Sequence, residues 1–293
     1  MRPKSTSVSV LGPGALGGAV VDLIQNRSSL FNLHSVWGRS AVDSYLIKEE
    51  RAEQARKDFP VEDSDLGQLI LITVPDDQIC AVCDKLSVKN INWTFRTVVH
   101  MSGSQSNSVL DILRKAGAQT GSLHPLQTFT KGDTGDRFKD IWFTFQGEKS
   151  CYPVLESLVT EAGAHLKTMT VEQKKMMHIA AVFASNYLVA LMDVVEQLTE
   201  SQSIEDGLEM LNPIIHQTIE NIFSRGTEQS LSGPIARGDE STVKDHLKQL
   251  GSDSDLGRLY KHLGMTALNI AHRNSRITDH DFAKISDILS KDG

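Results

Sequence analysis

The chain has 293 residues and a formal net charge of −7 at pH 7, a length that accommodates about two domains with buried cores. No block of lysine and arginine stands out, and no apolar run approaches the roughly twenty residues needed to cross a bilayer, so we expect neither a nucleic-acid nor a membrane partner. The stretch MRPKSTSVSV enters a strand pattern without the apolar core of a signal peptide, which predicts a cytoplasmic protein.

The first part of the chain, up to about Thr170, alternates short β-branched runs with helical stretches, which is typical of βαβ units and a parallel sheet. We expect strands at TSVSVL, LHSVWGR, a weakly marked third near DFPVE, LILITV, RTVVHM, QTGSLH, IWFTFQG and HLKTMT. Helices fit between them, for example at DQICAVCDKL and at QSNSVLDILRKAG, which ends at Gly117. Cys80 and Cys83 in the former lack a second Cys/His pair, so we expect small apolar packing residues and no metal site.

After Thr170 the pattern changes to helix after helix. A stretch of about thirty residues, VEQKKMMHIAAVFASNYLVALMDVVEQLTESQ, lacks Gly and Pro and is apolar around most of its circumference, which predicts a helix buried on several sides. Near the carboxyl end, Thr278 and Asp281 have the spacing of a capping box. The predicted fold is α/β, with a Rossmann dinucleotide-binding domain at residues 1–169 and an all-α domain at residues 170–293.

The glycine-rich stretch VLGPGALGG follows the first expected strand and opens a helix, the context that a dinucleotide-binding loop requires. Gly12 would allow the tight turn, Gly14 the approach of the pyrophosphate, and Gly17 close packing of helix on strand. The amino end of that helix, at Ala15 and Leu16, would offer free N–H groups to the phosphates. The alternative is a structural turn without a ligand.

Cofactor choice is expected to depend on the end of the second strand, where NAD-binding proteins usually place an acidic residue. This chain has Arg39 and Ser40, which can pair with a 2′-phosphate, so we predict NADP. The alternative for Arg39 is a solvent-exposed arginine in a loop. After the fourth strand, Val74 and Pro75 would lie at the crevice where ligands bind, and Pro75 would fix the loop under the nicotinamide ribose. The alternative is a simple turn and helix start with Asp76 as the N-cap.

Six segments together resemble a known bacterial family: GPGALGG, VWGRS, VPDDQI, GSLHPLQTF, HIAAVFASNYLVAL and GPIARGD. These are the Rossmann-like proteins with a helical carboxy-terminal domain of unknown function, often labelled NADP oxidoreductases. Their architecture is similar to the 6-phosphogluconate dehydrogenase superfamily, which includes ketopantoate reductase, pyrroline-5-carboxylate reductase and prephenate dehydrogenase. The resemblance implies a reductase fold without naming a substrate.

Hydride transfer also needs a proton donor or acceptor beside the substrate. His124 precedes Pro125 at the end of an expected strand, and prephenate dehydrogenases have a similar His-Pro that contacts substrate. Ser102 and Ser104 follow the fifth strand, where related enzymes orient substrate. The alternatives are a histidine satisfied by local hydrogen bonds and serines that only cap turns.

The long helix carries three polar residues, His178, Ser185 and Asn186, that can face one quadrant. Related dehydrogenases place Lys and Asn on this helix to act on the substrate oxygen. His178 occupies the Lys position here, and Lys174 and Lys175 lie about one turn earlier, so the identity of the proton donor stays open. These polar residues could instead satisfy one another.

Arg237, in the long loop of the helical half, could clamp a substrate carboxylate, although a pair with Asp239 or Glu240 is an equal alternative. We therefore expect a homodimeric NADP-dependent oxidoreductase that acts on a small, carboxylated keto, imino or enol substrate between its domains. Two alternatives remain open: a redox-silent NADP-binding sensor or regulatory protein, and a deazaflavin-dependent NADP reductase.

Overall fold

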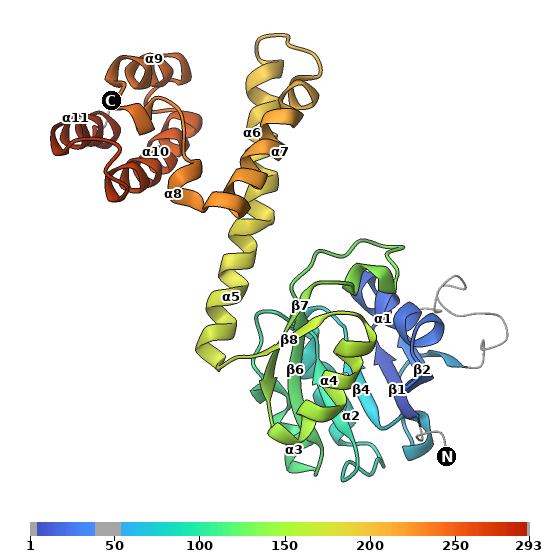
Figure 1. Cartoon of the computed structure of the whole chain (residues 1–293). Coiled ribbons are helices and arrows are strands. Elements are labelled where there is room, and N and C mark those ends of the chain that lie inside the picture. Colours follow the sequence, from blue (N-terminus) through green and yellow to red (C-terminus); the bar gives the residue numbers. More distant parts are fainter. Residues whose placement is uncertain (1–4, 39–53, 292–293) are drawn as a thin grey trace. The chain divides into compact units, whose positions relative to one another are not determined.

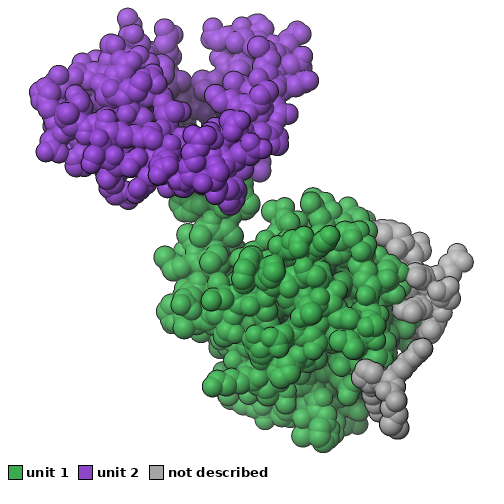
Figure 2. Space-filling model, in the orientation of Figure 1, with its two compact units in different colours: residues 1–187 green, residues 188–293 purple. Residues whose placement is uncertain are grey.

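The computed structural model describes residues 5–38 and 54–291, so the predicted phosphate ligands Arg39 and Ser40 lie outside the described residues. The chain divides into two compact units, residues 1–187 and residues 188–293 (Figure 2). The first unit contains the sheet and the second contains only helices (Figure 1).

The first unit is built on one eight-stranded sheet in the order β3-β2-β1-β4-β5-β6-β7-β8 (Figure 1). Its strands are β1 (Thr6–Leu11), β2 (Phe31–Gly38), β3 (Ala55–Lys57), β4 (Leu69–Ile72), β5 (Thr97–His100), β6 (Gln119–Pro125), β7 (Trp142–Gly147) and β8 (His165–Thr168). All neighbours pair in parallel except β6 and β7, which are antiparallel. The predicted α/β fold with an N-terminal Rossmann-like sheet is confirmed.

The strand order reverses between β1 and β4, which lie side by side with their carboxyl ends at the same edge of the sheet. Open α/β sheets bind their ligands in the crevice at such a switch point. The glycine loop leaves β1 and the loop at Thr73 leaves β4, so the chain brings both loops to this crevice.

Helices cover both faces of the sheet. On one face, α1 (Ala15–Asn26) and α4 (Tyr152–Glu161) pack on alternate residues of the strands, such as Val8, Val10 and Leu71. On the other face, α2 (Ile79–Ser87) and α3 (Asp111–Lys115) pack on their neighbours, such as Ile70 and Ile72. Because both faces are buried, β4 at the centre of the sheet is apolar throughout, with the sequence LILI.

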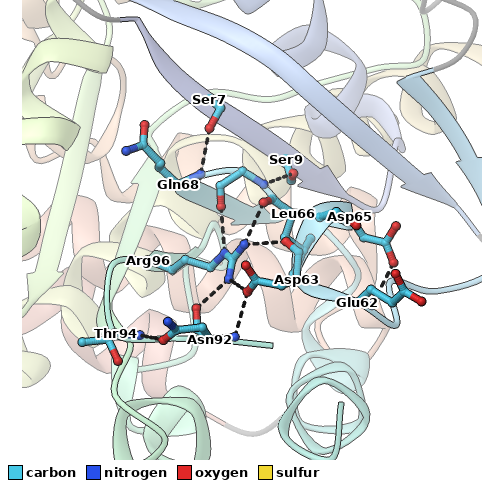
Figure 3. Close-up of polar contacts among 12 residues, drawn as sticks. Ser7, Ser9, Glu62, Asp63, Asp65, Leu66, Gln68, Asn92, Thr94 and Arg96 are labelled. Atoms are coloured by element: carbon cyan, nitrogen blue, oxygen red, sulfur yellow. Dashed lines mark hydrogen bonds and ion pairs between the residues drawn. The ribbon is translucent and has the colours of Figure 1, made fainter. Parts of the chain in front are cut away.

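Arg96 holds two loops together at the other end of the strands, where β4 and β5 begin (Figure 3). Its side chain is only 9% exposed. Its guanidinium donates to the Asp63 carboxylate and to four backbone carbonyl oxygens, those of Asn92, Asp63, Leu66 and Gly67. The loops before β4 and β5 are thereby tied together at the amino ends of these strands.

The second unit contains helices joined by short turns and one longer loop. Their bounds are α6 (Asn186–Glu200), which crosses the division between the units, α7 (Gly207–Arg225), α8 (Thr227–Ser230), α9 (Glu240–Leu250), α10 (Asp255–Arg273) and α11 (Asp279–Ser290). The last three bury a common core. The predicted capping box is present at the start of α11, where Asp281 N–H donates to Thr278 Oγ1 and Thr278 N–H donates to Asp281.

The structure locates the third strand and the start of the helical part of the chain. The third strand is Ala55–Lys57, just before the DFPVE segment, because only three residues pair with the end of β2 and leave no alternating pattern to read. Helical structure begins at α5 (Val171–Ala184), as the 169/170 boundary implies, whereas the compact units divide after Tyr187. The reason is that α5 contacts β7 and anchors Lys174 in the sheet unit.

The long apolar stretch differs from the prediction that it forms a helix buried on several sides. It forms α5 and α6 with an interruption at Ser185, and in these two fully described helices Lys174 is the one buried residue. Met176, Phe183 and Val189 are 63%, 65% and 70% exposed. By length and composition alone, Val171–Glu200 could cross a membrane, contrary to expectation, although such a test is weak evidence.

Candidate functional site

Two of the three loop glycines have a reason within the protein itself. Gly12 has φ = 100°, a conformation that glycine adopts without strain, and a β-carbon there would lie 2.7 Å from Cγ1 of Val74. A β-carbon on Gly17 would lie 2.3 Å from the carbonyl oxygen of Gly12, to which Thr73 Oγ1 also donates at 2.7 Å. These two glycines are required by the turn and by the packing of α1.

Gly14 has no such reason. It is the N-cap residue of α1, and a β-carbon there would meet no atom within 4 Å. No side chain caps this helix, so its first N–H groups, including those of Ala15 and Leu16, are left for a ligand. The space beside the backbone of Gly14 is therefore open.

A cavity of about 670 Å³ adjoins Gly14. It is lined by the glycine loop, the end of β2, the loop after β4 and one side of α2: Leu11, Gly12, Pro13, Gly14, Trp37, Gly38, Asp58, Phe59, Thr73, Val74, Pro75, Gln78, Ala81, Val82 and Lys85. The predicted cofactor residues Val74 and Pro75 are therefore part of its wall. The size suits a ligand that extends from the helix amino end past the end of β2.

A second cavity, of about 530 Å³, contains most of the residues predicted to act on substrate. His124, His178, Ser185 and Asn186 all line it. The rings of His124 and His178 have centroids 6.1 Å apart and meet edge to face at 74°. The sheet and α5 thus bring together two histidines that are 54 positions apart in the sequence.

Gly103 lies between these two rings. A β-carbon on it would be 2.6 Å from Nδ1 of His178 and 2.8 Å from Nε2 of His124. Any larger residue would push at least one ring away, so the glycine permits both nitrogens to face the same small volume. Sequence reasoning did not single out this residue.

Lys174 fixes the loop that carries Gly103. Its side chain is buried, and its ammonium donates to the carbonyl oxygens of Ser102, at 2.8 Å, and Gln105. An ammonium has three N–H donors, and these two carbonyls are its hydrogen-bond acceptors within residues 5–38 and 54–291. Burial lowers the Lys174 pKa to about 8, against the opposing effect of the nearby Asp76 carboxylate.

Together with burial, the positive charge of Lys174 lowers the pKa of two histidines, His124 and His100. Burial lowers the pKa of His124 to about 4, with further contributions from the positive charge of Lys174 and from His178. His100, at the end of β5, is completely buried and shows the same fall to about 4 from burial and Lys174. Both rings are therefore neutral near pH 7 and can offer one N–H and one lone pair each.

The two predicted serines have different surroundings. Ser102 Oγ accepts from the N–H groups of Ser104 and Gln105, at 3.2 and 3.0 Å, so its hydroxyl shapes the turn. Ser104 Oγ donates to the carboxylate of Asp76 at 2.5 Å. Asp76 directly follows Pro75 of the first cavity, and Ser104 directly follows Gly103 of the second site. This hydrogen bond joins the residue after Pro75 to the residue after Gly103.

The remaining predicted residues are more weakly placed. Ser185 Oγ lies 2.7 Å from the carbonyl oxygen of Ala181 and 3.0 Å from Oδ1 of Asn186, so these polar groups partly satisfy each other. Arg237 is exposed in the second unit, and no ion pair of its guanidinium occurs among the described residues. The expected carboxylate partners are engaged elsewhere, Asp239 with Thr242 and Glu240 with Lys284.

Four residues of this cluster were missed or set aside by sequence reasoning: Asp76, His100, Gly103 and Lys174. One signal was available, since Lys174 and His178 are four positions apart and share a helix face. The others depend on contacts between loops that are distant in sequence.

Comparison with known proteins agrees with this architecture. Residues 141–267 match the family model described as domain of unknown function DUF2520. A candidate NADP oxidoreductase from Bacteroides fragilis is similar over 90% of this chain and 98% of its own, with 20% identity and a TM-score of 0.71. A Thermotoga maritima protein is similar over 92% of this chain and 99% of its own, with 20% identity and a TM-score of 0.68.

More distant similarity extends to enzymes that reduce imines. A reductive aminase from Aspergillus terreus, solved in complex with NADPH4, cyclohexanone and allyl amine, covers 98% of this chain and 93% of its own. Its identity is 13% and its TM-score 0.56. The expected resemblance, a Rossmann-like fold with a helical domain of unknown function, is thereby confirmed.

Proposed function

We propose that this chain, which carries a DUF2520 domain on the fold shared with those oxidoreductases, is an NADP-dependent oxidoreductase. The observation that carries the proposal is the hydrogen bond of Ser104 to Asp76, which joins the loop that borders the first cavity at Pro75 to the loop that carries Gly103 beside His124 and His178. A dinucleotide with its pyrophosphate at Gly14 would have its reactive ring at the crevice beyond Val74, on the side where Asp76 meets Ser104. The names of the structural neighbours, which include NADP oxidoreductases and imine reductases, support the same function.

The residues present fit such a cofactor, because Gly14 is explained by a ligand and the amino end of α1 carries no side-chain cap. When bound, NADPH supplies the hydride for a carbonyl or imine carbon. His124 Nε2 and His178 Nδ1 would hold the substrate oxygen or nitrogen beside Gly103 and pass it the proton that completes the reduction. Lys174 is a positioning residue that fixes the Ser102–Gln105 loop against α5.

The substrate proposed is a small keto, imino or enol compound with a carboxylate. The positive charge of Lys174 near the neutral His124 ring favours a group that gains negative charge during reduction. Arg237, an exposed residue of the second unit, stays the candidate that the sequence offers for binding a carboxylate.

A direct test measures NADPH binding by calorimetry and then NADPH consumption with a panel of keto and imino acids. Gly14→Val should abolish dinucleotide binding while circular dichroism stays unchanged, because the side chain enters the space of the pyrophosphate. Wild-type affinity in this variant would show that the loop is only a turn. NADPH binding without turnover of any substrate would favour a redox-silent sensor, and turnover only with deazaflavin would favour that class of reductase.

We further propose that a second copy of the chain covers the exposed apolar side chains of α5, α6 and α7. Examples are Phe183, Val189 and Phe223, which is 88% exposed. Large apolar side chains exposed on several helices are typical of an association surface. Twofold-symmetric dimers are the commonest homo-oligomers. Light scattering should give a dimer mass, and Phe183→Glu with Phe223→Glu should shift it toward the monomer. A monomeric wild type that partitions into lipid vesicles would favour a bilayer as the covering phase.

A further inference from the structure

The cavity beside the glycine loop continues along α2 to a lysine that the proposed function does not use. It is lined by Gln78 and by the residues three, four and seven positions after it, which are Ala81, Val82 and Lys85. Residues with this spacing share one face of a helix. The face extends about 10 Å along the helix axis from Gln78 to Lys85, at 1.5 Å per residue.

The far end of this cavity has an apolar wall with one cation on it. Phe59 and Val82 are partly buried and pack against the core beneath them. The ammonium of Lys85 lies 5.9 Å from the centre of the Phe59 ring. No carboxylate pairs with Lys85 in the part of the chain that the structure describes, so its charge is not neutralised there.

We propose that Phe59 and Lys85 form the subsite for the phosphorylated adenosine of NADPH, with the Lys85 ammonium on the 2′-phosphate and Phe59 against the adenine. The proposal rests on the function proposed above. In this fold the adenosine half of a dinucleotide lies toward the end of the second strand, and Trp37 and Gly38 at that end border the same cavity. Lysine binds phosphate as a point charge on a long, flexible stem.

Asp58 is the other charged residue of the cavity and acts in the opposite sense. Its N–H donates to the carbonyl oxygen of Gly38 at 3.1 Å, which holds it beside the end of β2. A carboxylate in this region accepts hydrogen bonds from ribose hydroxyls and repels a 2′-phosphate. The preference between the two dinucleotides therefore depends on Lys85 and Asp58 together.

The test compares the full-length wild type with Lys85→Met, Lys85→Arg and Lys115→Met. Lys115 is an exposed lysine at the end of α3 that does not line the cavity, so its variant makes the same change in net charge elsewhere. Calorimetry with NADPH, NADH, 2′,5′-ADP and 5′-AMP should show that Lys85→Met weakens both 2′-phosphorylated ligands about tenfold or more. NADH and 5′-AMP should change less than twofold, Lys85→Arg should retain most of the affinity, and Asp58→Asn should strengthen NADPH binding.

Several results would overturn the inference. An equal loss for NADPH and NADH in Lys85→Met would show a structural role, and an unchanged NADPH affinity would show that the ammonium does not reach the phosphate. A wild type that binds NADH but not NADPH would refute the subsite while leaving dinucleotide binding intact. A wild type that binds neither would refute the proposed function and the subsite together.

Discussion

Two buried cations lie at opposite ends of the strands of the same sheet, and they differ in the number of hydrogen-bond acceptors around them. Arg96, at the amino ends of β4 and β5, has five N–H donors and five acceptors, four of which are backbone carbonyls (Figure 3). Lys174, beside the carboxyl ends of β5 and β6, has three donors and two carbonyl acceptors among the described residues. The first cation is saturated by the protein and the second is not.

We propose that this difference separates a structural cluster, around Arg96, from a functional one, around Lys174. A saturated guanidinium can bind no ligand without losing a bond, so Arg96 contributes to stability alone. Around Lys174, His124 and His178 turn nitrogen atoms toward Gly103 with no side chain between them, and the pKa of His124 is depressed. Perturbed titratable groups beside a cavity are characteristic of active sites.

The largest expected effect is on stability, from Arg96→Ala. The substitution leaves the carbonyl groups of Leu66 and Gly67 without this donor and the Asp63 carboxylate with Asn92 N–H in its place, and together with the lost packing of the buried side chain this should lower the free energy of unfolding by about 3 kcal/mol. Urea denaturation measures this loss. The NADPH affinity of the folded fraction should stay within twofold, and a large change in it would break the distinction between the two clusters.

Substitutions at the cluster around Lys174 should lower turnover, where Arg96→Ala lowers stability. His124→Ala should lower turnover about 10²–10⁴-fold with NADPH affinity nearly unchanged, because a group that holds the reacting atom is lost. Lys174→Met should lower turnover by a smaller factor and also raise the pKa of His124, since a nearby positive charge is removed. NMR titration of the His124 ring gives that shift, and His165→Ala, outside the cavity, is the control. A Lys174→Met protein with an unchanged His124 pKa would contradict the electrostatic coupling.

The glycine loop and the carboxyl-edge crevice were predictable because each follows from a local pattern. Gly12, Gly14 and Gly17 stand between an apolar strand and a helix, and Thr278 with Asp281 marks a helix start by spacing alone. The antiparallel pairing of β6 and β7, the hydrogen bond of Ser104 to Asp76 and the contacts of Lys174 were not predictable. Each depends on which loops the folded sheet brings together, and in α5 an apolar composition suggested burial that the single chain does not provide.

The pH dependence of stability should distinguish the histidine cluster by its direction. His100 and His124 have folded-state pKa values of about 4, below the unfolded value of 6.5, so the unfolded chain binds more protons between these pH values. The free energy of unfolding should therefore rise with pH from about 4 to 6.5. His124→Gln should reduce this slope by about one proton. A slope equal to that of the wild type would show that the ring is not held neutral in the folded protein.

The smallest expected effect concerns Asp63, the one ionised acceptor of Arg96. Asp63→Asn removes the charge but keeps an oxygen that can accept from the guanidinium and from Asn92 N–H, and the Asp63 side chain is 59% exposed. Solvent screens such a pair, so the loss of unfolding free energy at pH 7 should be only about 0.5–1 kcal/mol. The hydrogen bonds from Arg96 and Asn92 lower the pKa of Asp63 below its usual 3.8. A depressed carboxyl pKa stabilises the fold above the unfolded value and loses that effect as pH falls through the folded value. The difference between wild type and Asp63→Asn should therefore shrink below about pH 4, where a protonated carboxyl resembles the amide. A loss as large as that of Arg96→Ala would show that the charge, and not the carbonyl contacts, holds this edge of the sheet together.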